Sequence, residues 1–425
     1  MELWEIEGGL PLRGEVCVSR AKNAVLPQMA AALLTDEPVR ILNAPELIDV
    51  GRMAQMLLDL GCAVKSTPSA LDIVCAAPRV QGSGAIEGLT RASVLALGPL
   101  LARCGEAHLA LPGGCRIGAR PIDIHLSGLE AMGAEVSIDG GTVCARGRLH
   151  PARYRLKLPS VGATENLLMA AALTPGESII ENAAREPEIL DLVCMLRNMG
   201  AHVEGAGGYV LRVNGAKRLH GVTHMPIGDR IEAGTLLCAA AAAGGEVRVL
   251  GAQAAHLFAP LIALRRMGVQ LASDADSIWL RGRVNTGISI VTGAFPQFPT
   301  DLQAVFMALM AGANVHSEIT ETMFENRMRH VSELNRMGAR IELDGPTALI
   351  DGAHLRGASV EACDLRAGAA LAVAAVGAMG TTRLHGAQII RRGYENLDGK
   401  LVSMGAEIAV KVTEPVSELA LPRAD

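Results

Sequence analysis

The sequence predicts an α/β protein in which one structural unit is repeated six times. Three observations support this: the length of the chain, a set of evenly spaced glycines, and helices that are apolar on all sides. At 425 residues the chain is long for one hydrophobic core, so we expect two domains. Six amphipathic segments end in Leu or Met followed by Gly, and a stretch of alternating polarity comes next. These glycines are Gly61, Gly133, Gly200, Gly268, Gly338 and Gly405.

The spacing of these glycines defines the repeat. Successive members are 72, 67, 68, 70 and 67 residues apart. A glycine after a helix accepts the left-handed conformation that ends it. Each glycine therefore predicts the end of a helix and the start of a strand, and the regular period predicts a repeat architecture.

A second set of helices lies between the amphipathic ones and is apolar nearly all round. Helices without a polar face are buried, so we expect this set inside each domain, with sheets and amphipathic helices around it. Their first turns are polar, and helix N-termini that converge on one cleft make an anion site. Thr300 and Gln303 predict a capping box at one of these starts. The set comprises residues 22–34, 91–101, 162–173, 230–243, 301–311 and 366–379.

The six units divide into two domains of three. The first is expected at 22–227, and the second at 1–21 plus 228–425. The chain would cross between them near 19–21 and 226–228, with the active site in the cleft between the domains.

The loop at 111–123, LPGGCRIGARPID, carries the most reactive candidate side chain, Cys115. Gly-Gly disfavours helix and strand. Arg116 and Arg120 flank the cysteine, and nearby positive charge stabilises a thiolate. The alternative is that Cys115 is a small buried apolar side chain, as free cysteines commonly are.

Composition excludes several classes of function. A net charge of −5 gives no basic footprint for nucleic acid. Nine cysteines without a CxxC spacing indicate neither zinc nor a disulfide framework, so we expect a reduced, cytoplasmic protein. Apolar runs are too short to span a membrane, and the acidic N-terminus lacks a signal-peptide pattern. HExxH, P-loop and GxGxxG motifs are absent, and Gly221 and Thr223 argue against a metal pair at His220 and His224. We therefore expect no metal and no cofactor.

Cations recur at the starts of the apolar helices and in glycine-containing loops. Taken singly, such side chains are usually solvated surface groups, but buried cations need anionic partners. Guanidinium groups bind phosphate and carboxylate bidentately, so a substrate carrying both groups is predicted. Asp301 is, with Cys115, the candidate for proton transfer; the alternative is a charge that only complements a helix dipole. The cations are Lys22, Arg91, Arg120, Arg327, Arg366 and Arg392.

Ten motifs, in order along the chain, resemble the enolpyruvyl transferase family. The branch that uses UDP-N-acetylglucosamine is the more similar and the shikimate-pathway branch the more distant. The resemblance implies an inside-out α/β barrel of two domains, each of three βαβαββ-type units. The motifs are AKNAVLP at Ala21, TRASVLALGPL at Thr90, LPGGCRIGARPIDIH at Leu111, SVGATEN at Ser160, ENAAREPEI at Glu181, DRIEAGT at Asp229, FPTDLQA at Phe298, FENR at Phe324, DLRA at Asp364 and RGYE at Arg392.

The resemblance also implies an activity in peptidoglycan synthesis: transfer of the enolpyruvyl group of phosphoenolpyruvate to the 3-hydroxyl of UDP-N-acetylglucosamine, with release of phosphate. It implies Cys115 as general acid, with fosfomycin as its alkylating agent, and Asp301 as base. Phosphoenolpyruvate would be bound by Lys22, Asn23, Arg120, Arg327, Arg366 and Arg392. UDP-N-acetylglucosamine would be bound by Arg91, Arg120, Pro121, Ile122, Asp123, Ile124, Ser160, Val161, Gly162, Asp301 and Met323.

Four residues depart from the family pattern: Arg20, Arg116, Leu158 and Met323. They leave two alternatives open. One is a related transferase that acts on another uridine nucleotide, and the other is a sensor of nucleotide sugars without catalysis. The oligomeric state is not predicted.

Overall fold

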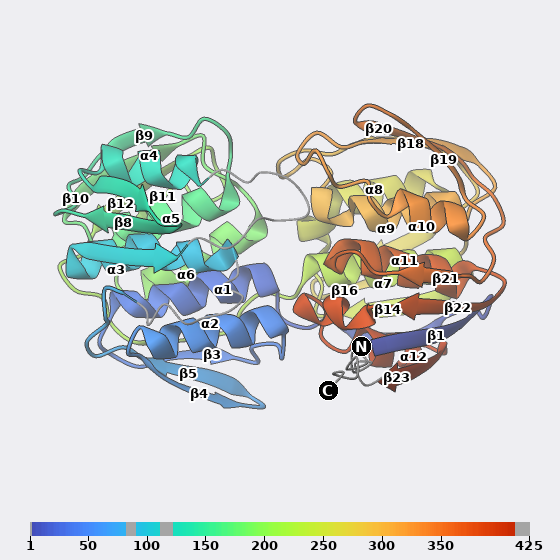
Figure 1. Cartoon of the computed structure of the whole chain (residues 1–425), viewed down its shortest axis with the longest axis horizontal. Coiled ribbons are helices and arrows are strands. Elements are labelled where there is room, and N and C mark those ends of the chain that lie inside the picture. The colour runs from blue at the N-terminus through green and yellow to red at the C-terminus, as the bar shows by residue number, and fades with distance from the viewer. Residues whose placement is uncertain (1, 82–90, 111–121, 413–425) are drawn as a thin grey trace, which may run out of the picture.

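The computed structural model describes residues 2–81, 91–110 and 122–412, without the side chains of residues 91 and 92. Two lobes lie side by side, each around its own hydrophobic core (Figure 1). The first lobe contains the elements from α1 to β13, and the second contains β1, β2 and the elements from α7 to β23.

The first lobe is built from three similar units. The first comprises α1 (Lys22–Ala31), η1 (Ala32–Leu34), β3 (Val39–Leu42), α2 (Ile48–Asp59), β4 (Ala63–Thr67) and β5 (Ala70–Val74). The second comprises η2 (Arg91–Ala96), α3 (Leu97–Cys104), β6 (Glu106–Ala110), α4 (Asp123–Ala131), β7 (Glu135–Asp139) and β8 (Thr142–Arg146). The third comprises β9 (Arg153–Arg155), α5 (Val161–Ala172), β10 (Gly176–Glu181), α6 (Pro187–Asn198), β11 (His202–Glu204) and β12 (Val210–Gly215), after which β13 (Val222–His224) pairs with β3 of the first unit.

The second lobe repeats the plan. Its first unit comprises β2 (Arg13–Cys17), α7 (Arg230–Ala243), β14 (Glu246–Leu250), η3 (Ala254–Leu257), α8 (Phe258–Arg266), β15 (Gln270–Ser273) and β16 (Ser277–Arg281). Its second comprises β17 (Ser289–Val291), η4 (Thr300–Leu302), α9 (Gln303–Ala311), β18 (His316–Thr320), α10 (Val331–Arg336), β19 (Arg340–Asp344) and β20 (Thr347–Asp351). Its third comprises β21 (Ser359–Glu361), α11 (Leu365–Gly377), β22 (Gly380–His385), η5 (Ala387–Arg392), α12 (Leu397–Ser403) and β23 (Glu407–Val412), with β1 (Glu2–Gly8) between β22 and β23.

Each unit contributes one sheet of the same design. In five sheets an antiparallel hairpin joins a third, antiparallel strand, and in the sixth β1 and β23, from opposite ends of the chain, take the place of the hairpin. In five of the six sheets described, a parallel strand extends the edge. The apolar helices lie inside the sheets, which makes the fold the expected inside-out α/β arrangement. All six repeat glycines have positive φ, between 87° and 104°, so the predicted helix ends are confirmed.

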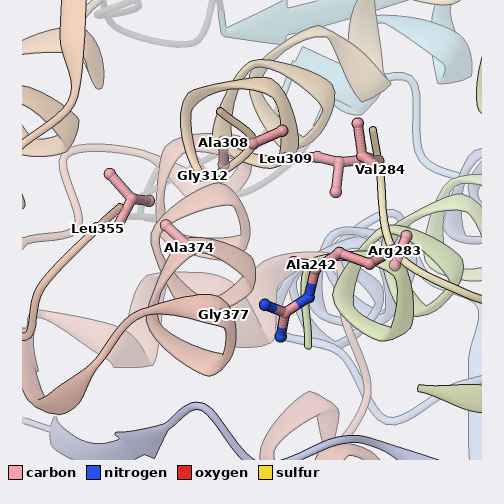
Figure 2. A pocket seen from close by; sticks show the side chains of 11 residues that line it. Ala242, Arg283, Val284, Ala308, Leu309, Gly312, Leu355, Ala374 and Gly377 are labelled. Carbon is pink, nitrogen blue, oxygen red and sulfur yellow. The ribbon is translucent and has the colours of Figure 1, made fainter. Parts of the chain in front are cut away.

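Small side chains let the central helices of the second lobe approach closely. A Cβ added to Gly377 of α11 would lie 3.1 Å from the Cβ of Ala242 in α7. Where these helices end, a cavity of about 10 Å³ remains, which Arg283 borders (Figure 2). The Arg283 guanidinium donates to the carbonyl of Ala243 at 2.9 Å. A space of this size is close to the minimum for one water molecule, so it is a packing feature of the core.

Two chain crossings join the lobes and lie against each other. Arg20 and Gly228 form an antiparallel bridge. The N–H of Ala21 donates to Ile227 at 2.9 Å, and that of Asp229 donates to Ser19 at 2.8 Å. The two connections therefore act as one short strand pair between the lobes.

The capping box predicted at Thr300 is wrong. The chain enters α9 through the 3₁₀ turn η4, and no side chain caps this turn. The Thr300 hydroxyl instead donates to Glu321 at 2.7 Å, and the Gln303 amide points to Met328. A carboxylate is a strong hydrogen-bond acceptor for a hydroxyl. Thr300 therefore binds Glu321 instead of capping the helix.

Candidate active site

Asp301 lies between two arginines of the second lobe. Its Oδ1 accepts from Nη2 of Arg327 at 2.5 Å, and its Oδ2 accepts from Nη2 of Arg366 at 2.8 Å. The arginine side chains are only 4% and 8% exposed, while that of Asp301 is 25% exposed. Adjacent cations favour the ionised carboxyl group, so Asp301 is a partly accessible carboxylate in a positively charged setting.

Both arginines retain a donor. Nη1 of Arg327 and Nη1 of Arg366 are buried and have no hydrogen-bond partner among the described residues. Burial of an unsatisfied charged donor is costly. Two such donors on either side of one carboxylate are typical of a site that receives an anionic ligand.

A second cluster joins the two lobes around Asp49. Its Oδ2 accepts from Lys22 Nζ at 3.3 Å, and its Oδ1 accepts from Arg392 Nε at 3.0 Å. Lys22 begins α1 in the first lobe, whereas Arg392 ends η5 in the second. One buried carboxylate thus places two cations from opposite lobes within reach of the same ligand.

Lys22 connects the two clusters electrostatically. Burial lowers the pKa of its ammonium group; the charges of Asp49 and Asp301 oppose this, and that of Arg366 adds to it. A Cβ on Gly393 would lie 3.4 Å from Lys22 Nζ. The absence of a side chain at Gly393 therefore keeps space open beside this cation.

Helix N-termini of the second lobe carry acidic caps beside these clusters. Asp364 accepts from the N–H groups of Arg366 and Ala367 at 2.8 and 3.0 Å. The cap fixes the first turn of α11 and with it the direction of the Arg366 side chain. The Arg366 guanidinium also stacks 5.4 Å from the ring centroid of Tyr394, which adds a cation–π contact.

The residues predicted for the nucleotide lie on α4 and α5 of the first lobe. Ser160 caps α5 by accepting from Ala163 N at 3.4 Å. A Cβ on Gly162 would lie 3.1 Å from His125, which is buried on α4. The two helix starts therefore adjoin through a position where a side chain does not fit. Ser160, Val161, Gly162 and Ile122 are half-buried, Asp123 is half-exposed and Ile124 is buried.

Two further predicted residues occupy accessible positions. Asn23 is half-buried on the first turn of α1. Met323 is 40% exposed, and its N–H donates to Glu321 at 2.7 Å. Any backbone contact from Met323 to a ligand would therefore use its carbonyl group.

Cys115, Arg120 and Pro121 lie outside the described residues, as does the side chain of Arg91. Their predicted roles remain predictions. Within the described part of the chain, no group of three or more His, Cys, Asp or Glu side chains is arranged to hold a metal ion. No helix there is both long and apolar enough to cross a membrane.

Sequence reasoning missed Asp49 and the ion pair of Glu188 with Arg230. Glu188 of α6 accepts from Arg230 Nε of α7 at 2.9 Å, again between lobes. A signal was present: Asp49 precedes Gly61 by 12 residues, and Glu188 precedes Gly200 by the same number. Because the two residues occupy the same position of the repeated unit, we would expect both carboxylates at the same face of the lobe.

Comparisons with known proteins identify the family and the fold of the chain. The family model described as EPSP synthase (3-phosphoshikimate 1-carboxyvinyltransferase) matches residues 6–401. The enolpyruvyl transferase NikO from Streptomyces tendae has a TM-score of 0.87 at 26% identity, covering 97% of this chain and 99% of that one. An EPSP synthase from Acinetobacter baumannii shares the fold, with a TM-score of 0.75 at 17% identity and coverage of 97% and 100%.

The chain therefore belongs to the EPSP synthase family, a class of carboxyvinyl transferases. Within that family, it is 47% identical over 416 residues to the UDP-N-acetylglucosamine 1-carboxyvinyltransferase of Granulibacter bethesdensis, covering 96% of this chain and 99% of the relative. The Gluconacetobacter diazotrophicus enzyme of the same name is 46% identical with the same coverage. Both the family and the fold expected from the motifs are confirmed.

Proposed function

We propose that this protein transfers the enolpyruvyl group of phosphoenolpyruvate to the 3-hydroxyl of UDP-N-acetylglucosamine and releases phosphate, in the cytoplasm, as a step of peptidoglycan synthesis. The observation that carries the proposal is the pair of charged clusters around Asp301 and Asp49. Two relatives named UDP-N-acetylglucosamine 1-carboxyvinyltransferase share nearly half of the residues of this chain over almost its full length.

The clusters match the charges of the donor substrate. Phosphoenolpyruvate carries a phosphate and a carboxylate, and Lys22, Arg392 and Arg120 would bind them, assisted by Arg327 and Arg366. The buried Nη1 atoms of Arg327 and Arg366 are donors available to an anion. Ligand binding would also satisfy cations on both lobes at once, which favours a rigid arrangement of the reacting groups.

Asp301 would act as the base at the sugar hydroxyl. Its two arginines favour the ionised form, and an ionised carboxylate can accept the proton of a hydroxyl group. Cys115 would protonate the methylene carbon of phosphoenolpyruvate, and the hydroxyl oxygen would attack the cationic carbon next to it. Asp301 would take the hydroxyl proton. Phosphate would then leave while one proton of the new methyl group returns to a base, and this elimination would regenerate the vinyl group.

The acceptor would lie on the first lobe, with Asn23 in contact with both substrates. Residues 160–162 at the start of α5, Arg91 and residues 120–124 would bind the nucleotide, and Met323 would approach it from the second lobe. The domain division at 22–227 and 1–21 plus 228–425 is part of this proposal, because it places substrate groups on both sides of the two crossings.

The test is phosphate release from phosphoenolpyruvate with UDP-N-acetylglucosamine and, separately, with other uridine nucleotides. We expect release that depends on the N-acetylglucosamine nucleotide and is lost in Cys115→Ala. Cys194→Ala, at an exposed cysteine of α6, is the matched control and should retain activity. Release with a different acceptor only would identify a repurposed transferase, and no release with any nucleotide would favour a sensor.

Arginine variants test the donor site. Arg392→Met should raise the KM for phosphoenolpyruvate strongly. Its neighbour Arg391 pairs with Glu2 and Asp398 away from Asp49, so Arg391→Met should leave the KM nearly unchanged.

Intact-mass measurement after fosfomycin treatment should show one adduct that Cys115→Ala lacks.

A further inference from the structure

The first hairpin of the chain differs at one position from the four other hairpins and from the β23–β1 pair, which takes the place of a hairpin in the sixth unit. In each of these strand pairs, the residue that follows the repeat glycine directly precedes the first paired residue of its strand. It lies opposite the residue that directly follows the partner strand's last paired residue. In five units this pair combines Ala or Val with Gly: Ala134 with Gly147, Ala201 with Gly215, Val269 with Gly282, Ala339 with Gly352 and Ala406 with Gly8. In the first unit it is Cys62 with Cys75.

The two cysteines are in contact and buried. Their Sγ atoms are 2.6 Å apart, with the Cys62 thiol donating to Cys75. Cys62 is 4% exposed and Cys75 is fully buried. A disulfide bond is about 2.05 Å long, so closing one here requires roughly half an ångström of movement.

A cation adjoins this pair. Arg103 of α3 donates to the carbonyl of Ala76, the residue after Cys75, at 3.0 Å. The same guanidinium donates to the carbonyls of Leu33 and Thr35 at 2.9 and 2.8 Å, which holds it in place. The hydrogen bond from Cys62, aided by the charge of Arg103, lowers the pKa of the Cys75 thiol. A thiolate is the reactive form of cysteine, and the lowered pKa favours it at Cys75.

We propose that Cys62 and Cys75 are a redox-reactive dithiol, a modification site that a peroxide converts to an intramolecular disulfide across the β4–β5 hairpin. The site is separate from the clusters around Asp301 and Asp49. The repeat architecture does not require it, since the five other units have Ala or Val and Gly in its place.

The chemistry balances with hydrogen peroxide as the oxidant. The Cys75 thiolate attacks one peroxide oxygen, the O–O bond breaks, and the hydroxide that leaves is protonated to water. The resulting sulfenic acid loses its oxygen as a second water when the Cys62 sulfur attacks, and an S–S bond forms. Two thiols and one peroxide thus give one disulfide and two waters; the sulfurs together lose two electrons, and the peroxide gains them.

Access and consequence both follow from the position at the end of the hairpin. Cys75 is the first residue after β5 and Cys62 the last before β4, at the edge of the core of the first lobe. Local opening of this end of the hairpin would therefore expose both thiols. The bond would close a loop over the hairpin and restrict the unfolded chain. We therefore expect the oxidised protein to melt several degrees higher than the reduced protein.

The experiment is peptide mapping of the full-length protein after brief treatment with hydrogen peroxide, unfolding and alkylation of the remaining thiols. We expect a cross-linked peptide pair containing Cys62 and Cys75, 2 Da lighter than the two free peptides, which dithiothreitol abolishes. Its share of all cross-links should be higher in the folded protein than in urea, because only the fold holds these two sulfurs together. Cys62→Ala, which installs the residue found at this position in four other units, should remove both the cross-link and the rise in melting temperature.

Cys194→Ser is the control and should keep both effects, because Cys194 is an exposed cysteine on another element. The proposal is overturned if Cys62 and Cys75 are fully alkylated after oxidant doses that oxidise Cys194. It is also overturned if Cys75 links to Cys104 or another thiol instead. These readouts do not use catalytic activity, so their outcome is independent of the proposed function.

Discussion

Two ion pairs join the lobes from matched positions, yet they differ in exposure and in partners. Asp49 and Glu188 both lie in the first turn of an amphipathic helix, and each binds an arginine of the second lobe. The pair of Glu188 with Arg230 is closed, with side chains 3% and 8% exposed. The pair of Asp49 with Arg392 is open, because Arg392 is 38% exposed and Asp49 also binds Lys22.

The same position of the repeated unit therefore serves stability at Glu188 and ligand binding at Asp49. A buried pair that loses one partner leaves an uncompensated charge, so the Glu188 pair holds the lobes together. A half-exposed pair contributes little stability but leaves its cation available to a ligand. The same position of the repeat thus holds the lobes together in one unit and prepares a binding site in the other.

The largest effect should come from breaking the closed pair. Glu188→Gln leaves Arg230 buried without its carboxylate, and we expect the free energy of unfolding to fall by about 3 kcal/mol. Urea denaturation followed by circular dichroism measures this. The double variant Glu188→Leu with Arg230→Met removes both charges and should recover most of the loss. A single variant as stable as the parent would contradict the conclusion that this buried pair stabilises the contact between the lobes.

Asp49→Asn should affect catalysis more than stability. Without the carboxylate, Lys22 and Arg392 repel each other, and we expect kcat/KM for phosphoenolpyruvate to fall about 100-fold, equivalent to about 2.7 kcal/mol. Steady-state kinetics at saturating acceptor measure this. Asp72→Asn, which breaks an ion pair with the exposed Arg40, is the matched control. Equal losses in both variants would remove the distinction between the two clusters.

A second matched pair predicts pH dependence. His125 precedes Gly133 by eight residues, and His330 precedes Gly338 by eight. Burial lowers the pKa of each imidazole to about 4. In the unfolded chain, with a pKa near 6.5, each takes up a proton at a higher pH than in the folded chain. Stability is therefore complete above about pH 6.5 and is lost as the pH falls toward 4.

For His330 alone, lowering the pH from 7.5 to 5.5 should cost about 1.4 kcal/mol of unfolding free energy. His330→Gln should remove this part of the dependence and leave the part that belongs to His125. Urea melts of both proteins at the two pH values provide the measurement. An unchanged pH dependence in the variant would show that His330 is not protonated differently in the two states.

The smallest effect is expected at the chain crossings. Arg20 donates to the carbonyl of Pro226 at 3.2 Å, a third contact across the two connections. Arg20→Ala removes one hydrogen bond and should cost about 1 kcal/mol. If the free energy of unfolding fell as much as in Glu188→Gln, the crossings would contribute as much to stability as the buried ion pair.

Much of the fold was predictable because its signals are local. Gly61 and its five counterparts are helix ends that a single residue type determines, and all have the predicted conformation. The 230–243 helix matches α7 because an apolar run with an acidic cap is unambiguous. The capping box predicted at Thr300 was wrong, because its hydroxyl donates to Glu321, which is not a local neighbour in the sequence.

The site was predictable where a motif carried it and not where it depends on pairing between lobes. The motifs pointed to Asp301, Arg327 and Arg366, which the structure brings together. The sequence around Asp49 has no motif, and its contact with Arg392 spans 343 positions of the chain. Glu188 and Arg230 each lie in a recognised motif, but nothing local indicates that they bind each other.

The place of β1 has a consequence for synthesis on the ribosome. β1 is made first but lies between β22 and β23, the strands made last. The first lobe has all of its described strands once β13 has emerged, whereas the sixth sheet must wait until β23 has emerged. At cellular rates of chain elongation, this leaves the N-terminal strand unpaired for tens of seconds, during which Trp4 and Ile6, both fully buried in the finished protein, are exposed to chaperones.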